Sequence, residues 1–155
     1  MTLDVLSPLA GSVVSLDDVP DPVFSGRLVG PGLAVDPARD PASPAEVTAA
    51  APITGRVAKI HPHAFVITAD DGRGVLVHLG LDTVGLGGAG FTVHCAEGAR
   101  VSAGDPVVTW NPAGIEAGGL NPIVPIIALE ADEAALALTA PGTAAAPGDA
   151  LITWS

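Results

Sequence analysis

An internal repeat constrains the fold of this chain more strongly than any other feature of its sequence. Residues Pro8–Val13 match Pro52–Val57, and residues Gly98–Trp110 match Gly142–Trp154, with a spacing of 44 residues in both cases. One spacing in two separate stretches indicates two copies of a small β-motif, in which a Gly-Asp turn leads into an apolar strand. Because the copies interleave along the chain, the repeat predicts a single domain over residues 1–155 with one shared core.

The composition fits a fold of many short strands. The 155 residues include 19 glycines and 15 prolines, roughly twice the average share, and both residue types are poor in helix interiors. Because 48% of the residues are hydrophobic and only 15% are charged, the chain is not disordered. The single cysteine, Cys95, cannot form an internal disulfide, and neither a signal peptide nor a run of about 18 apolar residues is present. We therefore expect a cytoplasmic protein that does not enter the membrane.

The charge of the chain restricts its partners. Seventeen acidic residues against six basic ones give a net charge of −11, and Lys59 is the only lysine. Nucleic acids and anionic membranes repel such a protein, whereas a basic protein surface complements it. We expect a monomer that binds basic protein partners and no nucleic acid.

Short strands are expected at ten places, with two short helices among them. The strands are Leu3–Leu6, Ser12–Ser15, Leu33–Val35, Arg56–Ile60, Ala64–Thr68, Gly74–Leu79, Phe91–His94, Pro106–Trp110, Ile123–Ala128 and Ala150–Trp154. The helices are Pro112–Ala117 and Asp132–Leu138, the second with acidic residues in its first turn, where the helix dipole favours them. Pro37–Pro44 has the composition of an exposed loop.

Two histidines flank a predicted hairpin. Asp70-Asp71-Gly72 separates two apolar runs, which begin at His63 and end at His78. A two-residue loop of Asp70-Asp71 would set His63 directly opposite His78, whereas a loop of Asp71-Gly72 would set Phe65 opposite His78. In either register the alternation of side chains leaves both imidazoles on one face. Their neighbours on that face would be Phe65, Ile67 and Leu76, and the other face would carry Val66, Val75, Val77 and Leu79.

Two facing histidines in an apolar setting have few uses. In phosphoryl transfer, one neutral imidazole attacks phosphorus and the second donates a hydrogen bond to the phosphoryl group. In a metal site, both rings supply nitrogen ligands and a third ligand is needed. The remaining interpretation is a pair of hydrogen-bonded structural histidines.

Longer motifs surround these histidines. The most specific are His63-Ala64-Phe65 and the later run Val77-His78-Leu79-Gly80-Leu81-Asp82-Thr83-Val84. The others are Ser7-Pro8-Leu9-x-Gly11, Asp18-Val19-Pro20-Asp21-Pro22-Val23-Phe24, Val29-Gly30-x-Gly32, Ala51-Pro52-Ile53-x-Gly55, Leu86-x-Gly88-x-Gly90-Phe91 and Glu97-Gly98-x-x-Val101-x-x-Gly104-Asp105. Through these motifs the chain resembles, over nearly its whole length, the glucose-type enzyme IIA domain of the bacterial phosphoenolpyruvate-dependent sugar phosphotransferase system.

The resemblance implies a fold, a reaction and two partners. The fold is an all-β antiparallel sandwich, a barrel-sandwich hybrid with an internal duplication. His78 looks like the residue that takes a phosphoryl group on Nε2 from the phosphocarrier protein HPr and passes it to a cysteine of a IIB domain, coupled to sugar uptake. His63 would hydrogen-bond the phosphoryl group and assist its onward transfer. The family uses no cofactor for this step beyond the covalent phosphohistidine, although the pair His63 and His78 could take up adventitious zinc.

Five further residues match the partner-binding surface of the family. Asp21 and Asp82 match acids that meet arginines on HPr or IIB, and their alternative role is to cap local backbone in turns. The matching apolar residues are Val23, Phe24 and Val84, whose alternative role is ordinary core packing.

The chain departs from the family pattern beside the first histidine. Many relatives place a threonine two residues earlier, where its hydrogen bond orients the imidazole. Here that residue is His61, followed by Pro62. Either His61 takes over the orienting role, or backbone groups hold the ring.

Three alternative functions come from other classes. The unphosphorylated domain could act as a regulatory binding protein that docks on transporters or enzymes. A zinc endopeptidase of the lysostaphin-like fold uses a His-x-His pair, which His61-Pro62-His63 imitates, but no histidine precedes His61 to complete its motif. A biotinyl or lipoyl carrier needs a lysine in a hairpin turn, and Lys59 lies beside no such turn.

Overall fold

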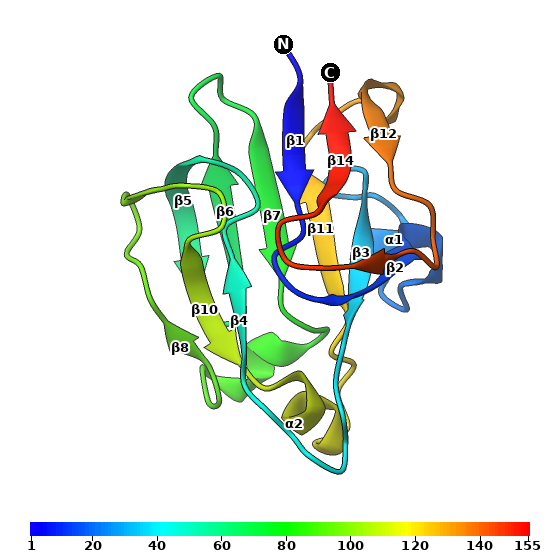
Figure 1. Cartoon of the computed structure of the whole chain (residues 1–155), viewed down its shortest axis with the longest axis vertical. Coiled ribbons are helices and arrows are strands. Elements are labelled where there is room, and N and C mark those ends of the chain that lie inside the picture. The colour runs from blue at the N-terminus through cyan, green and yellow to red at the C-terminus, as the bar shows by residue number, and fades with distance from the viewer.

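The computed structural model describes all 155 residues. Its architecture is built from short antiparallel strands (Figure 1). The strands are β1 (Leu3–Leu6), β2 (Gly11–Ser15), β3 (Gly32–Pro37), β4 (Val47–Ala50), β5 (Gly55–His61), β6 (Ala64–Thr68), β7 (Gly74–His78), β8 (Thr92–Val93), β9 (Arg100–Val101), β10 (Pro106–Trp110), β11 (Val124–Ala128), β12 (Leu136–Leu138), β13 (Ala144–Ala145) and β14 (Ala150–Trp154). The helices are α1 (Pro22–Ser25) and α2 (Pro112–Ala117), and the 3-10 turns are η1 (Leu16–Asp18), η2 (Thr83–Leu86) and η3 (Glu133–Ala135). None of these helices is long and apolar enough to cross a membrane.

The strands form one large sheet and two small ones. The large sheet has eight strands in the order β13-β2-β3-β11-β7-β6-β5-β9. The small sheets have the orders β1-β14-β12 and β4-β10-β8, and both lie over one side of the large sheet in Figure 1. All pairs are antiparallel, which confirms the predicted all-β antiparallel sandwich.

The strand pairing reproduces the repeat in the sequence. Leu3 pairs with Trp154 in one small sheet, and Val47 pairs with Trp110 in the other, so both partners shift by the spacing of 44 residues. The large sheet repeats the same rule, since β13 pairs with β2 as β9 pairs with β5. The duplication predicted from the sequence is therefore confirmed as a pseudo-twofold arrangement.

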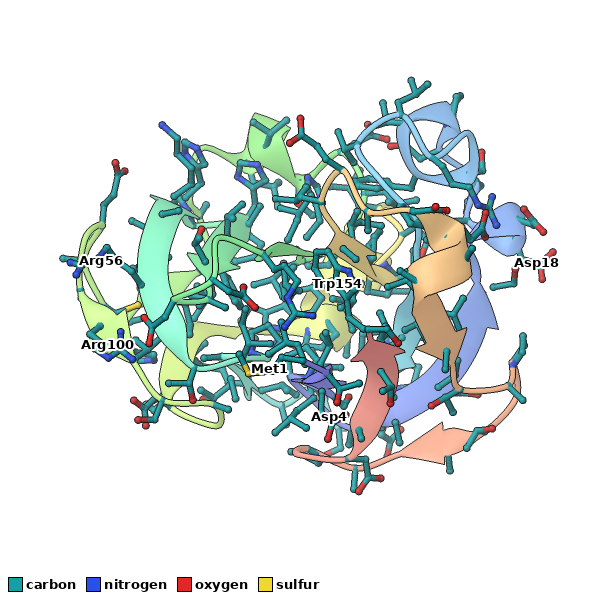
Figure 2. All side chains as sticks on the ribbon, turned by 90° about the horizontal axis from the view of Figure 1, so that it is seen from above. Met1, Asp4, Asp18, Arg56, Arg100 and Trp154 are labelled. Carbon is teal, nitrogen blue, oxygen red and sulfur yellow. The ribbon has the colours of Figure 1, made fainter.

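The two copies are joined by reciprocal hydrogen bonds. The Leu6 N–H donates to the Pro52 carbonyl and the Ala50 N–H donates to the Pro8 carbonyl, both at 2.9 Å. Each copy therefore completes the backbone hydrogen bonding of the other, and either copy alone would leave these backbone groups unpaired. In Figure 2, Arg56 and Arg100 of the copy with β5 and β9 lie at one side of the molecule. Asp18 of the copy with β2 and η1 lies at the opposite side.

The main core lies between the large sheet and the two small ones. It contains 25 buried residues from all three sheets. Three of them, Phe65, Trp110 and Ile126, are each at most 1% exposed. A second, smaller core fills the outer side of β3 and β11, where Leu16, Val19 and Phe24 cover Ile127. The segment with η1 and α1 is thus a lid over one half of the large sheet only.

The expected strands all occur, with ends that differ by at most two residues, and α2 has the predicted bounds. The expected helix Asp132–Leu138 is wrong. Asp132 caps only the short turn η3, and Leu136–Leu138 then forms β12, which pairs with β14. Pairing with an available strand edge outweighs the local helix propensity of this segment. Helix α1 and strands β4, β9 and β13 were not predicted.

Candidate functional site

The hairpin that carries His78 has a register that the sequence did not predict. Its loop has three residues, Asp70–Gly72, and the Ala69 N–H donates to the Arg73 carbonyl at 2.8 Å. Ala64 is therefore opposite His78, so both predicted registers are wrong. Gly72 has φ of +93°, the left-handed conformation that closes a three-residue hairpin loop.

The predicted division of side chains between the two faces is also wrong in part. The core face of the hairpin carries Phe65, Ile67, Val75 and Val77, all buried. Leu76 and Val66 lie on the other face with His78. The side chain of His78 therefore points away from the main core. Phe65 and Ile67, which were expected beside it, lie on the opposite face.

The two imidazole rings still meet, because His63 does not belong to the strand. Pro62 and His63 form the two-residue turn between β5 and β6, with His61 paired to Ala64. The Leu79 N–H donates to the His63 carbonyl at 2.7 Å, which ties this turn to the end of β7. The ring centroids of His63 and His78 lie 5.2 Å apart with an interplanar angle of 71°. The predicted convergence of the rings is confirmed, by a turn and not by strand alternation.

One hydrogen bond sets the tautomer of His78. Its Nδ1 lies 2.6 Å from the Gly80 carbonyl oxygen, which can only accept. Nδ1 therefore carries the proton, and in the neutral ring Nε2 keeps its lone pair. His78 is half-buried, so this nitrogen sits in a partly dehydrated setting at the edge of the sheet.

The loop after His78 is built to present the Gly80 carbonyl. Gly80 has φ of +82°, and a Cβ there would lie 2.7 Å from Thr83 Cγ2. The buried Thr83 hydroxyl donates to the Leu79 carbonyl at 2.8 Å, and the Leu81 N–H donates to the Asn121 carbonyl at 2.8 Å. Gly80 and Thr83 support the site, yet they were quoted only as parts of a motif, because nothing in their residue types points to a carbonyl acceptor.

The duplication explains why this face of β7 is open. By pairing position, the equivalent of His78 in the other half is Ile127, opposite Gly32 as His78 is opposite Ala64. Ile127 is buried beneath the lid with η1 and α1. No such lid covers His78, although Phe24 reaches it from the neighbouring half, with ring centroids 5.2 Å apart.

Burial keeps both rings neutral. Desolvation lowers the pKa of His78 below the ordinary 6.5, and the Gly80 hydrogen bond and the carboxylates of Asp21 and Asp82 oppose this shift in part. Desolvation also lowers the pKa of His63, with smaller contributions from the charges of His78 and His61. A neutral imidazole is the form that can act as a nucleophile.

These pKa directions predict how stability depends on pH. Because both pKa values are lowered in the folded state, the unfolded chain binds more protons just below pH 6.5. We expect the free energy of unfolding to fall as the pH decreases from 6.5 toward the folded-state pKa values. Urea unfolding across this window measures it, and a variant with His63→Gln and His78→Asn should show a flatter dependence. Imidazole NMR signals that titrate above 6.5 would contradict the prediction.

The two acidic residues predicted for the partner surface lie beside His78. Asp21 also caps α1, since the Val23 N–H donates to its Oδ1 at 2.9 Å, so the capping alternative holds for this residue as well. Asp82 is exposed, makes no capping hydrogen bond and has a left-handed φ of 61°. Because its side chain supports no local backbone, its charge is available to a partner.

The apolar residues predicted for that surface divide into two kinds. Val23 is 42% exposed and Val84 is 65% exposed, so both present apolar surface to solvent. Phe24 is only 4% exposed and belongs to the smaller core, so its core role holds together with its contact to His78. Leu86, 37% exposed, adds to the open apolar surface after His78 and was not predicted for it.

The site is an exposed patch and not a small-molecule pocket. Three cavities of about 280 to 310 Å³ lie elsewhere, and none is lined by His61, His63 or His78. No group of three His, Cys, Asp or Glu side chains is arranged to hold a metal ion. The peptidase alternative, which needs three protein ligands for zinc, has no such cluster to use. A patch of this kind can act on a group that another protein delivers.

Comparisons with known proteins identify the family of the chain. The family model for the phosphoenolpyruvate-dependent sugar phosphotransferase system, EIIA 1, matches residues 3–134. The glucose-specific EIIA component of Bacillus cereus is 36% identical over 146 residues, which cover 93% of this chain and 84% of that protein. The glucose-specific EIIA component of Staphylococcus aureus is 40% identical over 133 residues, covering 84% and 76%.

Two further relatives extend the comparison. The mannose-specific EIIBCA component of Corynebacterium glutamicum is 40% identical over 125 residues, which are 81% of this chain but only 18% of that protein. The solved structure of glucose permease IIA from Mycoplasma capricolum superposes with a TM-score of 0.87 at 32% identity, covering 99% of this chain and 96% of that one. The chain therefore belongs to the glucose-type EIIA family, the phosphocarriers of the phosphoenolpyruvate-dependent sugar phosphotransferase system.

Proposed function

We propose that this phosphocarrier works through a phosphohistidine at His78, which receives the phosphoryl group from phosphorylated HPr and delivers it to a cysteine of a IIB domain. His63 would assist as the hydrogen-bond donor to the phosphoryl oxygens. The proposal implies a cytoplasmic location, which suits the single cysteine of the chain, Cys95.

Each transfer is an in-line exchange of one phosphorus bond. In the first, the Nε2 lone pair of His78 forms a P–N bond while the P–N bond to the HPr histidine breaks, and its electron pair returns to that ring. In the second, a IIB thiolate forms the P–S bond while the P–Nε2 bond breaks, and the electron pair returns to Nε2. The proton on Nδ1 of His78 stays on the Gly80 hydrogen bond in both steps, so neither step needs an additional proton donor.

The hydrogen bond between His78 Nδ1 and the Gly80 carbonyl carries this proposal. It leaves Nε2 as the nucleophilic nitrogen, and burial keeps the ring neutral. The His63 ring, 5.2 Å away, is close enough to reach an oxygen of a phosphoryl group held on His78.

The surroundings of His78 suit a basic protein partner. Exposed Val23 and Val84 offer apolar contact area, and Asp21 and Asp82 place negative charge beside it. With a net charge of −11, the whole molecule attracts a basic surface before contact. Packing of the two proteins around His78 would exclude water, which would otherwise hydrolyse the phosphohistidine.

Mass spectrometry tests the proposal directly. The whole chain incubated with phosphoenolpyruvate, enzyme I and HPr should gain the mass of one phosphoryl group, located on His78 by peptide mapping at alkaline pH. Omission of HPr should prevent the gain. A phosphoryl group on another histidine, or none, would overturn the assignment.

Charge reversal at Asp82 tests the partner surface. Asp82→Lys should slow association with HPr by roughly tenfold at low salt and flatten the salt dependence of the rate, because a rim charge acts mainly on encounter. Stopped-flow measurement of phosphoryl transfer at rising HPr concentrations gives both quantities. The matched control is Glu46→Lys, which changes the charge equally at an exposed position beside a cavity that no site histidine lines. Equal rates for the two variants would place Asp82 outside the interface.

A further inference from the structure

We propose that His61 is a positioning residue, whose ring stacks on the His63 imidazole and holds it at the angle needed beside the phosphoryl group. The inference rests on the function proposed above and identifies how this particular chain supports His63. It assigns the support to ring contact, not to a hydrogen bond.

The turn between β5 and β6 creates the stack. Ile60 pairs with Phe65 and His61 pairs with Ala64, so only Pro62 and His63 remain to reverse the chain. Pro62 fixes its own φ near −65°. In this tight turn the His61 and His63 rings lie 5.7 Å apart between centroids, with an interplanar angle of 27°.

His63 needs such support, because no protein group makes a hydrogen bond to its ring. The nitrogen anchor that His78 has in the Gly80 carbonyl has no counterpart at His63. Two rings restrict it instead: His61 stacks against it at an interplanar angle of 27°, and His78 meets it nearly edge-on at 71°. A hydrogen-bond donor must be held in place to be worth its full effect on a transition state.

A stacked ring has one consequence that a hydrogen-bonding neighbour would not have. Stacking occupies no nitrogen, so both His63 nitrogens remain available to the phosphoryl oxygens or to solvent. Burial lowers the pKa of His63, which keeps the ring neutral with one N–H to donate. His61 itself is exposed and belongs to neither core, so core packing does not explain a ring at this position.

Two substitutions separate stacking from every other role of His61. His61→Ala removes the stack, and His61→Phe keeps an aromatic ring without nitrogen or charge. His94→Ala is the matched control, since His94 is also exposed and follows β8 of another sheet, hydrogen-bonded to Thr109. Each protein is first labelled on His78, and its single-turnover transfer to the IIB domain of a glucose-type permease is then measured over a range of IIB concentrations.

We expect the rate of phosphoryl transfer to fall in His61→Ala only. His61→Ala should transfer about tenfold more slowly at saturating IIB, with the half-saturating IIB concentration unchanged, because the donor is misplaced while the interface is intact. His61→Phe and His94→Ala should transfer at the wild-type rate. In parallel, ¹³C relaxation of the His63 ring should show a lower order parameter in His61→Ala and a wild-type value in His61→Phe.

Two results would overturn the inference. One is a wild-type transfer rate together with a wild-type order parameter of the His63 ring in His61→Ala. The other is an equal loss in both variants, which would mean that His61 acts through charge or hydrogen bonding. The ring-order measurement needs no partner and no phosphorylation, so it decides the inference even if wild-type protein takes up no label, a result that would end the proposed function instead.

Discussion

A His78→Asn variant is expected to take up no phosphoryl label from phosphoenolpyruvate in the presence of enzyme I and HPr, a loss of at least about a thousandfold. Asparagine removes the nucleophile and little else. Its amide nitrogen can donate to the Gly80 carbonyl in place of Nδ1, but its lone pair is delocalised and does not attack phosphorus. The measurement is acid-labile label retained on the protein after rapid filtration.

The control for this experiment is another histidine in the same chain. His94→Asn changes an exposed imidazole just after β8, hydrogen-bonded to Thr109 and outside the sheet that carries His78, and should be labelled as fast as wild type. Similar melting temperatures for the two variants would show that the loss is chemical. Acid-labile label on His78→Asn would mean that another nitrogen accepts the phosphoryl group.

The repeat implies strands that the local strand signals missed. Shifting Leu3–Leu6 by the repeat spacing of 44 gives the residues of β4, a strand whose own composition gave no signal. The same shift relates β9 to β13, each only two residues long. Such short ladders have no periodicity to detect, and their existence depends on the neighbour that the duplication supplies.

The hairpin shows where local reasoning fails. Asp70-Asp71-Gly72 fits loops of two or three residues equally well, and its register decides which side chains are buried. β7 also pairs with β11 on its other side, with Val77 opposite Ile126, so the register depends on a strand distant in the sequence. Strand alternation predicted that the histidines meet, but in the structure the turn at Pro62 and His63 brings the two rings together.

Single residues with two roles are also hard to assign from sequence. Phe24 is both core and site, because the lid over β3 and β11 ends beside His78. Asp21 is both a helix cap and a charge near the imidazole. Gly80 is hard to assign for a different reason, because the group that acts in the site is its backbone carbonyl, which every residue has. Only the left-handed φ and the absence of a side chain make it suitable there.

His63→Gln is expected to separate the two transfers. The variant should still accept a phosphoryl group from HPr, because the nucleophile and its tautomer depend on His78 and Gly80 and not on His63. Onward transfer to IIB should fall by roughly a hundredfold, the usual effect of losing one well-placed donor to a developing charge. Glutamine can donate a hydrogen bond, but it cannot stack on His61 or meet the His78 ring edge-on as the imidazole does.

Rapid-quench experiments resolve the two steps on the same protein. The first records the labelling of His78 by phosphorylated HPr, and the second records the loss of that label to IIB after purification. An interface defect would raise the half-saturating concentration of IIB, whereas a lost donor lowers the rate at saturation and leaves that concentration unchanged. Equal slowing of both steps would mean that His63 acts on the nucleophile. Normal transfer to IIB would mean that His63 has no part in the reaction, and that His78 transfers its phosphoryl group with donors supplied by the partner alone.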